Sequence, residues 1–563
     1  MRRRFCKYGS CAGAVPTGNS DNGASEHELD WRVQADDSLL RRAAENWMPD
    51  APEWFEKAFS RLPETIRVNP LRVDSQAVES WAESVGGIRN PWYTGPGSSW
   101  TLPFDRGGAT GDTRRVLIAL HETGRITRQE SVSMMPVLAL NPRPGEAVLD
   151  LCASPGSKTT QIAEFLGTEG LIVANERSRK RCNLLTANIQ RHRSNAAIVV
   201  NHDGRHMPRL SGDFGYDAVL VDAPCTGSGT TRKNPEVWRQ WRPSGGLGLQ
   251  GLQFSLLNKA ADLTRLGGRI VYSTCSLDPV ENEEVVCRIL QSRPDLELEE
   301  VGDYLPGVEI QDGLTSWPRI DDDLNIFQKM SDLSEEDEFD VSILKRCKRV
   351  SGHKMNAGGF FIALFRKQGE LSSKNGLQDV DIRAPEDGNQ ASRPIDSIES
   401  DWFSREFGGS NVSLWRRGKK ISIGTARMME AWSRPTIVSG GRASVEGERW
   451  RPLRVMQVGC DVSEYRGSRP SRIVESGVGF SRALAPKKIL KMRDSDVVEL
   501  LEGNAIDVDS IQTENTKISG GWLASYTNDF DPLPIWVGQK LTAMASEHER
   551  ICRLEFLRRA SDI

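Results

Sequence analysis

The clearest hydrophobic pattern in the chain lies between residues 146 and 290, where short apolar runs alternate with segments of helical spacing. The apolar runs are predicted strands, and each is followed by small or polar residues that begin a predicted helix. Apolar strands connected by helices are typical of a parallel sheet covered on both faces, so the pattern predicts a doubly wound α/β domain. The predicted strands are Ala147–Leu151, Leu171–Asn175, Ala197–Asn201, Tyr216–Val221 and Gly268–Ser273, and the predicted helices are 159–166, 178–191 and 247–266.

The segments on either side of this domain have weaker patterns. Residues 28–145 combine helical spacing with a short predicted strand at 63–70, which predicts an α+β extension. The apolar run 358–365 predicts a late strand that closes the α/β domain, and we place that domain at 146–368. Short apolar runs return in residues 401–563 and predict a smaller, β-rich C-terminal domain.

Two segments have the composition of irregular chain. Residues 369–400 hold seven acidic and three basic residues and no aromatic residue, which predicts an acidic linker. Residues 1–27 are predicted to be a disordered basic start, since the first 20 include Arg2, Arg3, Arg4 and Lys7 and no acid. A transit peptide and a nuclear-targeting patch are the alternatives for this start.

The composition of the whole chain excludes several classes of protein. A hydrophobic content of 38% over 563 residues is enough for packed cores, and no apolar run is long enough for a membrane-spanning helix. The ten cysteines form no CxxC pair and histidines number only seven, so neither a zinc site nor a disulfide scaffold is expected. The net charge of −4 gives no chain-wide basic signature, but the predicted linker alone accounts for that balance.

Candidate ligand-binding residues follow the predicted strands, because the strands of an open parallel sheet present ligands at their carboxyl ends. The first strand ends in a turn of small residues, where backbone N–H groups can approach a ligand at the start of a helix. This turn has neither the GxxxxGK[ST] nor the GxGxxG pattern, which argues against a nucleoside triphosphate or a dinucleotide. Glu176 is placed to accept hydrogen bonds from a ribose diol, and Asp203 to meet an adenine amino group. An adenosyl ligand without phosphates, such as S-adenosylmethionine, fits this set, although each acid alone is as well explained as a solvated carboxylate. The turn comprises Cys152, Ala153, Ser154, Pro155, Gly156, Ser157 and Lys158.

Two cysteines follow the fourth and fifth predicted strands. Cys225 lies in Asp222-Ala-Pro-Cys225, and Cys275 in Thr274-Cys275-Ser276. A thiolate is a strong nucleophile where polar surroundings lower its pKa, and Lys158 with nearby backbone N–H groups could supply such surroundings. Either cysteine alone would be explained as a buried structural thiol, whereas two beside an acid at the ligand-binding rim indicate nucleophilic catalysis.

The segments that contain these residues resemble a known family. LDLCASPGSKTTQ, VDAPCTGSGTTRKNPEVW and YSTCSLDPVENE are similar to motifs I, IV and VI of the Sun/nucleolar-protein (NSUN) family of RNA cytosine-5 methyltransferases. GRITRQESVSMMPVLAL (124–140) and NAGGFF (356–361) extend the resemblance, which covers about residues 55–367 and is greatest to the eukaryotic tRNA branch. LRVMQVGCDV (453–462) weakly resembles the PUA-like, RNA-binding C-terminal region of that branch.

The resemblance implies a Rossmann-like methyltransferase domain that uses S-adenosylmethionine and forms 5-methylcytosine in tRNA. It implies that Cys275 is the nucleophile, that Cys225 promotes release of the product, and that Asp222 and Lys158 belong to the catalytic centre. It also implies that residues 152–158, Glu176, Asp203 and Asp222 contact the cofactor. Two departures are Ser154, where the usual pattern has Ala or a similar small residue, and Glu176, where Asp is usual.

An RNA substrate leads us to expect basic and stacking residues beside the rim. Residues 28–145 would then be an RNA-recognition extension, and Trp238 and Trp241 either stack bases or lie in a core. The basic helix 177–193 either contacts phosphates or is an ordinary solvated face. The expected RNA-binding residues are Arg125, Arg128, Arg181, Arg232, Lys233 and Asn234.

Several alternatives remain for the function. An enzyme of the same chemistry could act on rRNA, a DNA cytosine-5 methyltransferase would share the Pro-Cys of motif IV, and a degenerate member would only bind RNA. The second cysteine argues against the DNA enzyme, and the retained Cys, Asp and Lys residues argue against a degenerate site. We expect a monomer without metal or membrane partner, in the nucleus or nucleolus, with mitochondrion and cytoplasm as alternatives.

Overall fold

The computed structural model describes residues 31–208, 215–329, 339–369 and most of 392–561. The expected basic start and residues 370–391 of the expected linker lie outside the described residues. No helix in the described ranges is long and apolar enough to cross a membrane. Nor do three or more His, Cys, Asp or Glu side chains of those ranges converge so as to hold a metal ion.

The α/β domain is built on one large sheet, and its centre confirms the doubly wound prediction. The strand order is β11-β14-β15-β9-β8-β5-β6-β7-β21, with β10 beside β15. Strands β5 to β9 run parallel, whereas β15 and β21 add to the two sides in antiparallel register. The strands are β5 (Ala147–Asp150), β6 (Leu171–Asn175), β7 (Ala197–Asn201), β8 (Tyr216–Asp222), β9 (Thr264–Thr274), β10 (Leu296–Glu299), β11 (Gln311–Asp312), β14 (Lys348–Val350), β15 (Phe360–Lys367) and β21 (Arg454–Val458).

Helices cover both faces of this sheet because its strands are apolar on both sides. In β5, Leu149 joins the core formed with α10 and α11, while its neighbour Val148 joins the core formed with α6, α7 and α8. Alternate residues of a strand point to opposite faces, so an uninterrupted apolar run supplies both cores. The helices are α6 (Ser131–Leu140), α7 (Ser157–Leu166), α8 (Arg179–His192), α9 (Val237–Gln240), α10 (Pro243–Leu263) and α11 (Glu283–Ser292).

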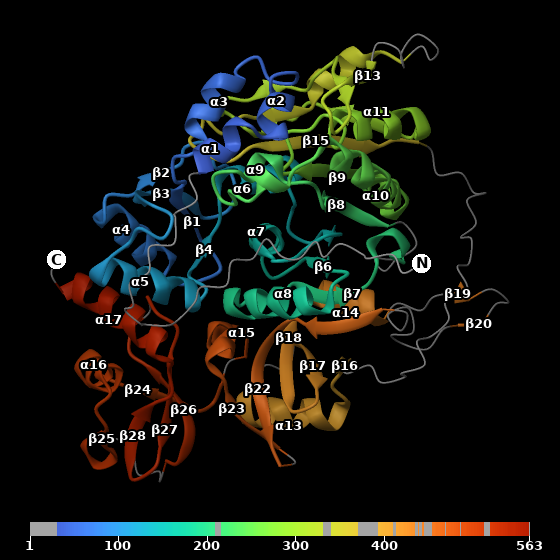
Figure 1. The fold of residues 1–563 in the computed structure, drawn as a ribbon. Coiled ribbons are helices and arrows are strands. Elements are labelled where there is room, and N and C mark those ends of the chain that lie inside the picture. The colour runs from blue at the N-terminus through green and yellow to red at the C-terminus, as the bar shows by residue number, and fades with distance from the viewer. Residues whose placement is uncertain are drawn as a thin grey trace, which may run out of the picture.

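The N-terminal extension has mixed structure, as its pattern predicts. Three short helices pack against α9, and an antiparallel sheet of order β2-β3-β1-β4 carries two further helices. Figure 1 shows this part in blue beside the α/β domain. Its elements are α1 (Trp31–Asp36), α2 (Leu39–Ala44), α3 (Ala51–Lys57), α4 (Ser75–Ser84), α5 (Gly111–Glu122), β1 (Pro63–Val68), β2 (Ile88–Arg89), β3 (Ser98–Asp105) and β4 (Ile126–Arg128).

The C-terminal part contains two five-stranded sheets, ordered β16-β17-β18-β22-β23 and β24-β26-β27-β28-β25. The β-rich prediction is therefore confirmed, although this part holds two sheets where a single small domain was expected. The elements of the first sheet are β16 (Ser392–Pro394), β17 (Ser413–Arg417), β18 (Lys420–Gly424), β22 (Cys460–Arg466), β23 (Arg469–Ile473), α13 (Ser397–Phe407) and α14 (Ala426–Ser433). Those of the second are β24 (Ile489–Lys491), β25 (Ile506–Asp507), β26 (Gly520–Ser525), β27 (Leu533–Val537), β28 (Lys540–Ala543), α16 (Asp494–Glu502) and α17 (Glu547–Ser561).

Two boundaries differ from the sequence-based expectation. Residues 392–400, the end of the expected linker, form β16 and the first turn of α13, where Asp396 and Glu399 make a reciprocal capping box. The stretch 453–462, expected in the C-terminal domain, supplies β21, which pairs with β7 of the α/β sheet before the chain enters β22. The C-terminal part is thus joined to the α/β domain by sheet pairing.

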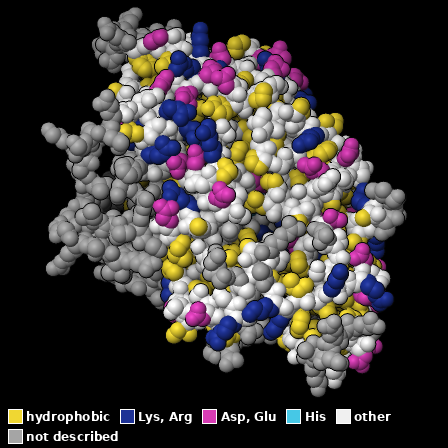
Figure 2. Space-filling model, turned by 180° about the vertical axis from the view of Figure 1, so that it is seen from behind, with side chains coloured by type: hydrophobic (Ala, Val, Ile, Leu, Met, Phe, Trp, Pro, Cys, Tyr) yellow, Lys and Arg dark blue, Asp and Glu magenta, His cyan; other side chains and the backbone are white. Residues whose placement is uncertain are grey.

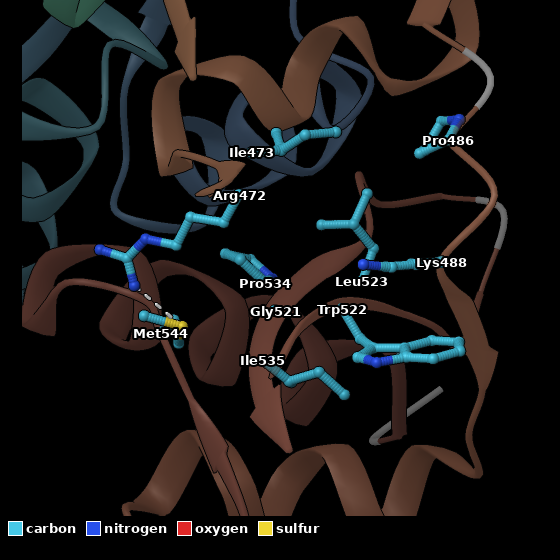
Figure 3. A pocket seen from close by; sticks show the side chains of 10 residues that line it. All are labelled: Arg472, Ile473, Pro486, Lys488, Gly521, Trp522, Leu523, Pro534, Ile535 and Met544. Atoms are coloured by element: carbon cyan, nitrogen blue, oxygen red, sulfur yellow. Dashed lines mark hydrogen bonds between the residues drawn. The ribbon is translucent and has the colours of Figure 1, made fainter. Parts of the chain in front are cut away.

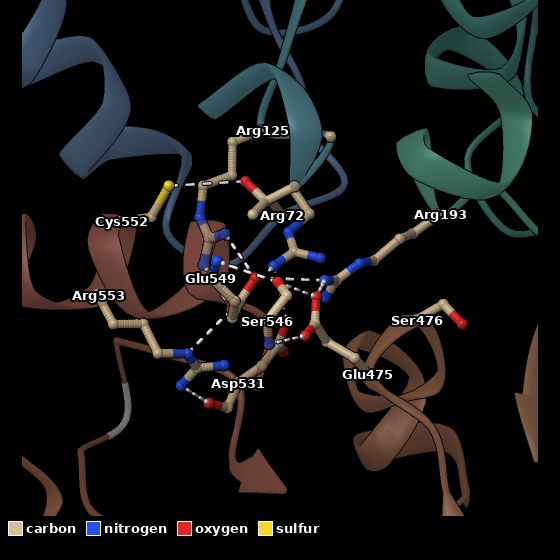
Figure 4. A network of polar contacts seen from close by, with 12 residues as sticks. Arg72, Arg125, Arg193, Glu475, Ser476, Asp531, Ser546, Glu549, Cys552 and Arg553 are labelled. Carbon is tan, nitrogen blue, oxygen red and sulfur yellow. Dashed lines mark hydrogen bonds and ion pairs between the residues drawn. The ribbon is translucent and has the colours of Figure 1, made fainter. Parts of the chain in front are cut away.

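A buried network of charges ties the three parts together (Figure 4). Glu549 of α17 accepts hydrogen bonds from Arg125 of the N-terminal extension at 2.8 and 2.9 Å and from Arg193, which follows α8, at 3.2 Å. The same carboxylate pairs with Arg553 at 2.9 Å. Since Glu549 and Arg125 are fully buried, the last helix is held against α5 by charge as well as by packing.

Candidate active site

The two cysteines that follow the fourth and fifth strands meet at the rim of the sheet. Cys225 follows β8 and Cys275 follows β9, and these neighbouring parallel strands pair Asp222 with Ser273. The Sγ atoms of Cys225 and Cys275 are 3.4 Å apart. Both cysteines are partly exposed, so a ligand at the rim can reach the pair.

A buried carboxylate that the sequence reasoning did not single out holds the two cysteine loops together. Glu281 accepts the backbone N–H of Thr226 at 2.9 Å and the hydroxyls of Thr226 and Ser276. The backbone N–H of Gly229 donates to the carbonyl of Cys275 at 2.9 Å, which adds a direct link between the loops. Burial raises the pKa of Glu281. The signal was present in YSTCSLDPVENE, where Glu281 follows Cys275 by six residues, but nothing in the pattern indicates that it reaches the other loop.

Lys158 and Asp222, two of the predicted catalytic residues, form an ion pair beside the two cysteines. The ammonium of Lys158, in the first turn of α7, lies 2.8 Å from a carboxylate oxygen of Asp222 and donates to the Ser133 hydroxyl at 3.0 Å. The second carboxylate oxygen of Asp222 accepts the Ser273 hydroxyl at 2.9 Å. Lys158 also lies 5.1 Å from the centre of the Phe360 ring. These contacts fix both groups at the end of β8, from which Cys225 follows.

The electrostatic surroundings of Cys225 favour its protonated form. The neighbouring Cys275 thiol and burial raise the pKa of Cys225 well above its ordinary value. Cys225 therefore keeps its proton at neutral pH. A pair in which one thiol stays protonated can combine a proton carrier with a nucleophile.

The turn after β5 has the tight geometry that its small residues predict. Gly156 has a φ of 111°, and a Cβ at that position would lie 2.8 Å from a methyl carbon of Leu185. Backbone of this kind favours glycine, and it lets α7 begin at Ser157 directly beside the rim. The Arg181 guanidinium donates to the Ser154 carbonyl at 2.6 Å and stabilises the turn from α8.

The two other predicted cofactor acids also lie at strand ends. Glu176 follows β6, is buried, and accepts the N–H of Ser178 at 2.7 Å. Asp203 follows β7 and pairs with Arg205 at 2.7 Å, and the hydrogen bonds from Arg205 lower the pKa of Asp203 below its ordinary range. Glu176 and Asp203 thus sit on the same rim as the turn, each with part of its carboxylate already engaged.

Charge around the turn fits a cationic ligand. Burial and the nearby carboxylates of Asp150, Glu176 and Asp222 raise the pKa of the Cys152 thiol. Burial raises the pKa of Asp150 to about 7, and one oxygen of this buried carboxyl has no hydrogen-bond partner. An excess of carboxylates stabilises a sulfonium ion and disfavours phosphates, so the donor set fits S-adenosylmethionine.

Two of the six expected RNA contacts, Arg125 and Arg232, have structural roles, and so do the two tryptophans considered for base stacking. Arg125 is buried in the network around Glu549 and presents no surface to a phosphate. Trp238 and Trp241 lie in a core with the helices of the N-terminal extension, which favours the alternative of structural tryptophans. Arg232 donates to backbone carbonyls of Ser60, Arg61 and Ala357, and so joins the extension to the loop before β15.

The other expected RNA contacts remain at or near the surface. Arg128 pairs with Glu64, and 30% of its side chain is exposed. Arg181 is exposed beside the turn after β5, Lys233 is exposed, and Asn234 is partly exposed. Acidic and basic side chains are interspersed over the face seen in Figure 2, so no single basic field dominates that side.

Comparisons with known proteins match the part of the chain that holds this site. A family described as 16S rRNA methyltransferase RsmB/F matches residues 137–366. The chain is 39% identical over 277 residues to the multisite-specific tRNA:(cytosine-C(5))-methyltransferase of Saccharomyces cerevisiae, covering 45% of this chain and 40% of the yeast protein. It is 35% identical over 258 residues to the tRNA (cytosine(49)-C(5))-methyltransferase of Pyrococcus abyssi, covering 45% of this chain and 78% of that protein.

One solved structure, of a methyltransferase homologue from Pyrococcus horikoshii, is 28% identical with a TM-score of 0.46, covering 61% of this chain and 100% of that one. The chain spans less than half the length of the first eukaryotic relatives, between 40% and 45% of each.

Proposed function

Because this chain belongs to the RsmB/F family of RNA cytosine-5 methyltransferases, we propose that it transfers a methyl group from S-adenosylmethionine to carbon 5 of cytosine in tRNA. The observation that carries the proposal is the pair of thiols of Cys225 and Cys275, 3.4 Å apart beside the Lys158–Asp222 pair. The tRNA specificity is supported by the names of the yeast and archaeal relatives.

The first step uses Cys275 as the nucleophile. Carbon 5 of cytosine is too weak a nucleophile to accept a methyl group unaided, so the Cys275 sulfur adds to carbon 6 and makes carbon 5 electron-rich. Asp222, held by Lys158 and the Ser273 hydroxyl, lies at the end of the neighbouring strand and is the group that hydrogen-bonds the ring as charge develops.

The cofactor would be held by residues 152–158, Glu176 and Asp203, and it supplies an electrophilic methyl group to carbon 5. The carboxylates around Cys152 favour its positive charge at this place. After transfer, a water molecule takes the proton from carbon 5, the electrons of that bond restore the double bond between carbons 5 and 6, and Cys275 leaves carbon 6 as a thiolate. The thiol of Cys225, 3.4 Å away and protonated because its pKa is raised, donates a hydrogen bond to that thiolate and so promotes its release.

The roles of the two cysteines can be separated by mutation. We expect Cys275→Ala to abolish methyl transfer without a covalent complex, and Cys225→Ala to accumulate an enzyme–RNA adduct that survives denaturing gel electrophoresis. The control is Cys287→Ala, which removes a buried thiol of α11 that lies away from the pair and should leave turnover intact. Adduct formation by Cys275→Ala instead of Cys225→Ala would reverse the assignment.

A second candidate substrate is small-subunit rRNA, because the family description names 16S rRNA. A relative called ribosomal RNA small subunit methyltransferase F in Vibrio vulnificus is 33% identical over 335 residues, and the alignment covers 67% of it. Purified tRNA and purified small-subunit rRNA, each incubated with enzyme and labelled cofactor, distinguish the two. Label in 5-methylcytosine of rRNA alone would replace tRNA in the proposal, and label in neither would refute both.

A further inference from the structure

The residues directly after the two cysteines of the site share one hydrogen-bond acceptor. Thr226 follows Cys225 in the chain, and Ser276 follows Cys275. The hydroxyls of Thr226 and Ser276 both donate to the same carboxylate oxygen, Oε2 of Glu281. One atom thus fixes the neighbours of both thiols, whose sulfur atoms are 3.4 Å apart.

The second carboxylate oxygen of Glu281 is also fully engaged. Its Oε1 atom accepts the backbone N–H of Thr226 at 2.9 Å and the side-chain amide of Gln253, in α10, at 3.0 Å. The amide of Gln253 also donates to the carbonyl of Pro224 at 3.0 Å. A carboxylate has room for about four hydrogen bonds, and here all four are donated by the protein. Glu281 and Gln253 are fully buried, so this arrangement is shielded from water.

The Glu281 backbone is anchored on the strand that carries Cys275. The hydroxyl of Tyr272, a buried residue of β9, donates to the Glu281 carbonyl at 2.5 Å. The carboxylate therefore has a fixed position relative to Cys275, and it extends from there to the loop that holds Cys225.

Cys225 depends on this arrangement more than Cys275 does. Cys275 directly follows Thr274, the last residue of β9, and the Thr274 hydroxyl accepts the N–H of Ser276 at 3.1 Å. Cys225 is separated from Asp222, the last residue of β8, by two residues. A cysteine next to a strand keeps its place through the sheet, whereas one further along a loop needs side-chain contacts to hold it.

We infer that Glu281 is a positioning residue for the release step. Its carboxylate keeps the Cys225 thiol beside the Cys275 sulfur while that sulfur is bonded to carbon 6 of cytosine and as it leaves. In this step the carbon–sulfur bond breaks, its electron pair returns to the sulfur of Cys275, and the Cys225 thiol donates a hydrogen bond to the thiolate. The inference rests on the proposed function for the reaction, and adds to it a residue that acts through Cys225.

The test separates the first turnover from the later ones. The full chain is mixed with RNA and labelled S-adenosylmethionine, and rapid quenching gives the rate of the first methyl transfer. Steady-state turnover follows in the same reaction, and denaturing gel electrophoresis gives the fraction of enzyme joined to RNA.

Thr226→Val removes the hydroxyl that donates to Glu281 and keeps the size of the side chain. We expect its first methyl transfer to stay within about threefold of the wild type and its steady-state turnover to fall about tenfold or more, because a thiol displaced by even part of 1 Å assists poorly. The enzyme–RNA adduct should accumulate. Thr226→Ser restores the hydroxyl and should restore release.

Glu281→Gln tests the acceptor itself. The amide keeps one acceptor oxygen but replaces the other with an NH₂ group, so the hydroxyls of Thr226 and Ser276 lose their common acceptor. We expect slow release and accumulation of the adduct here too. Thr226→Val also removes the acceptor of the Trp241 indole N–H, 3.1 Å away, which Glu281→Gln leaves in place. Because the two changes break the same contact, the double variant should lose less than the product of the two separate factors.

Two control variants separate release from general loosening. Thr264→Val is the same substitution at a buried threonine at the other end of β9, whose hydroxyl donates to the Ala260 carbonyl at 2.7 Å. Leu523→Ala truncates a buried side chain beside a small pocket of the C-terminal part (Figure 3). Neither should accumulate the adduct. Equal slowing of first and later turnovers without adduct in Thr226→Val, or adduct in either control, would overturn the inference.

A measurement without RNA lets the inference and the proposed function fail separately. In a buffer of reduced and oxidised glutathione, the yield of the disulfide between Cys225 and Cys275 reports the effective concentration of one thiol at the other. Mass spectrometry of the linked peptides gives this yield. We expect the effective concentration to fall about threefold or more in Thr226→Val and to stay at the wild-type value in Thr264→Val.

The outcomes are distinct. Wild-type disulfide yield together with wild-type turnover in Thr226→Val would overturn the inference and leave the proposed function standing. A wild type that methylates no RNA would refute the function, and a lower disulfide yield in Thr226→Val alone would then still show that Glu281 positions the thiols. An unchanged yield would refute that positioning as well.

Discussion

Replacing Glu549 with glutamine should loosen the attachment of the last helix to the rest of the protein. The Glu549 carboxylate is fully buried and contacts Arg125, Arg193 and Arg553 at 2.8 to 3.2 Å. Glutamine keeps the size of the side chain and one acceptor oxygen, but it removes the negative charge. The change therefore tests charge pairing at nearly constant packing.

The magnitude follows from the burial of the arginines that would remain. Arg72 lies in the same network, where burial and the neighbouring Arg193 and Arg125 lower its pKa to about 10. Without Glu549 these cations face only Asp74, Asp531 and the partly exposed Glu475. Removing one partner of a buried pair costs about 3–5 kcal/mol, because the other charge stays buried without compensation. We expect a loss in that range.

The expected pH dependence has a definite sign. The arginines hold the pKa of Glu549 well below its ordinary value. A group whose pKa is lower in the folded state stabilises the fold above its unfolded pKa and loses that contribution as the pH falls through the folded value. The difference between wild type and Glu549→Gln should therefore be largest at neutral pH and shrink in acid.

Hydrogen exchange of the α17 amides is the suitable assay, since it reports the local opening free energy of one helix in a protein with several parts. A loss of 3 kcal/mol corresponds to roughly hundredfold faster exchange. The control is Glu555→Gln in the same helix, whose pair with Arg559 is partly exposed and worth less than about 1 kcal/mol. Equal exchange rates in the two variants, or an unchanged rate in Glu549→Gln, would refute the reasoning.

Three further predictions concern the site and its supports. Lys158→Met should lower the single-turnover rate of methyl transfer by about 10²- to 10⁴-fold, because Asp222 loses the ammonium group 2.8 Å away. A variant that loses only affinity for the cofactor would contradict this. Trp238→Ala should lower the free energy of unfolding, measured in urea, by about 3–5 kcal/mol, because Trp238 packs in a core. It should leave the Kd of the folded protein for RNA unchanged, and a higher Kd would show that Trp238 stacks on a base. Asp150 has a pKa raised to about 7, so the folded state binds more protons than the unfolded state between pH 4 and 7 and stability falls as the pH rises. Asp150→Asn should flatten that part of the stability curve of the cofactor-free protein, and an unchanged slope would show that another group titrates.

The rim of the sheet could be predicted from the sequence because it depends on topology alone. Apolar runs separated by helices imply parallel strands, and the residues after parallel strands must share an edge. Lys158, Glu176, Asp203 and the residues after β8 and β9 therefore follow from the positions of the strands. That Cys225 and Cys275 touch needs one more fact, the adjacency of β8 and β9, which the structure supplies.

The supports of the site could not be predicted, because their partners are far away in the chain. Arg125 lies in a basic motif and was expected to meet phosphate, yet its partner Glu549 is 424 residues further along. Trp238 packs on Trp54, which lies in a different part of the protein with no pattern that connects the two. The role of a basic or aromatic residue near a motif is therefore undetermined until the side chain that it contacts is known.

Pairing with acids inside the protein determines which cations are available to RNA. Arg72, Arg125, Arg193 and Arg553 are balanced by Asp74, Asp531, Glu475 and Glu549 inside the protein, so their charge contributes little to the field outside. The exposed cations of the described residues include Arg177, Arg179, Lys180 and Arg181 near the rim and Lys487 and Lys491 on the second C-terminal sheet. A long RNA bound at the rim can therefore also meet cations of the C-terminal module that Glu549 holds in place. Loosening that module should therefore raise the KM for long RNA more than it changes kcat, and Glu549→Gln assayed on full-length RNA against a short stem–loop measures that difference.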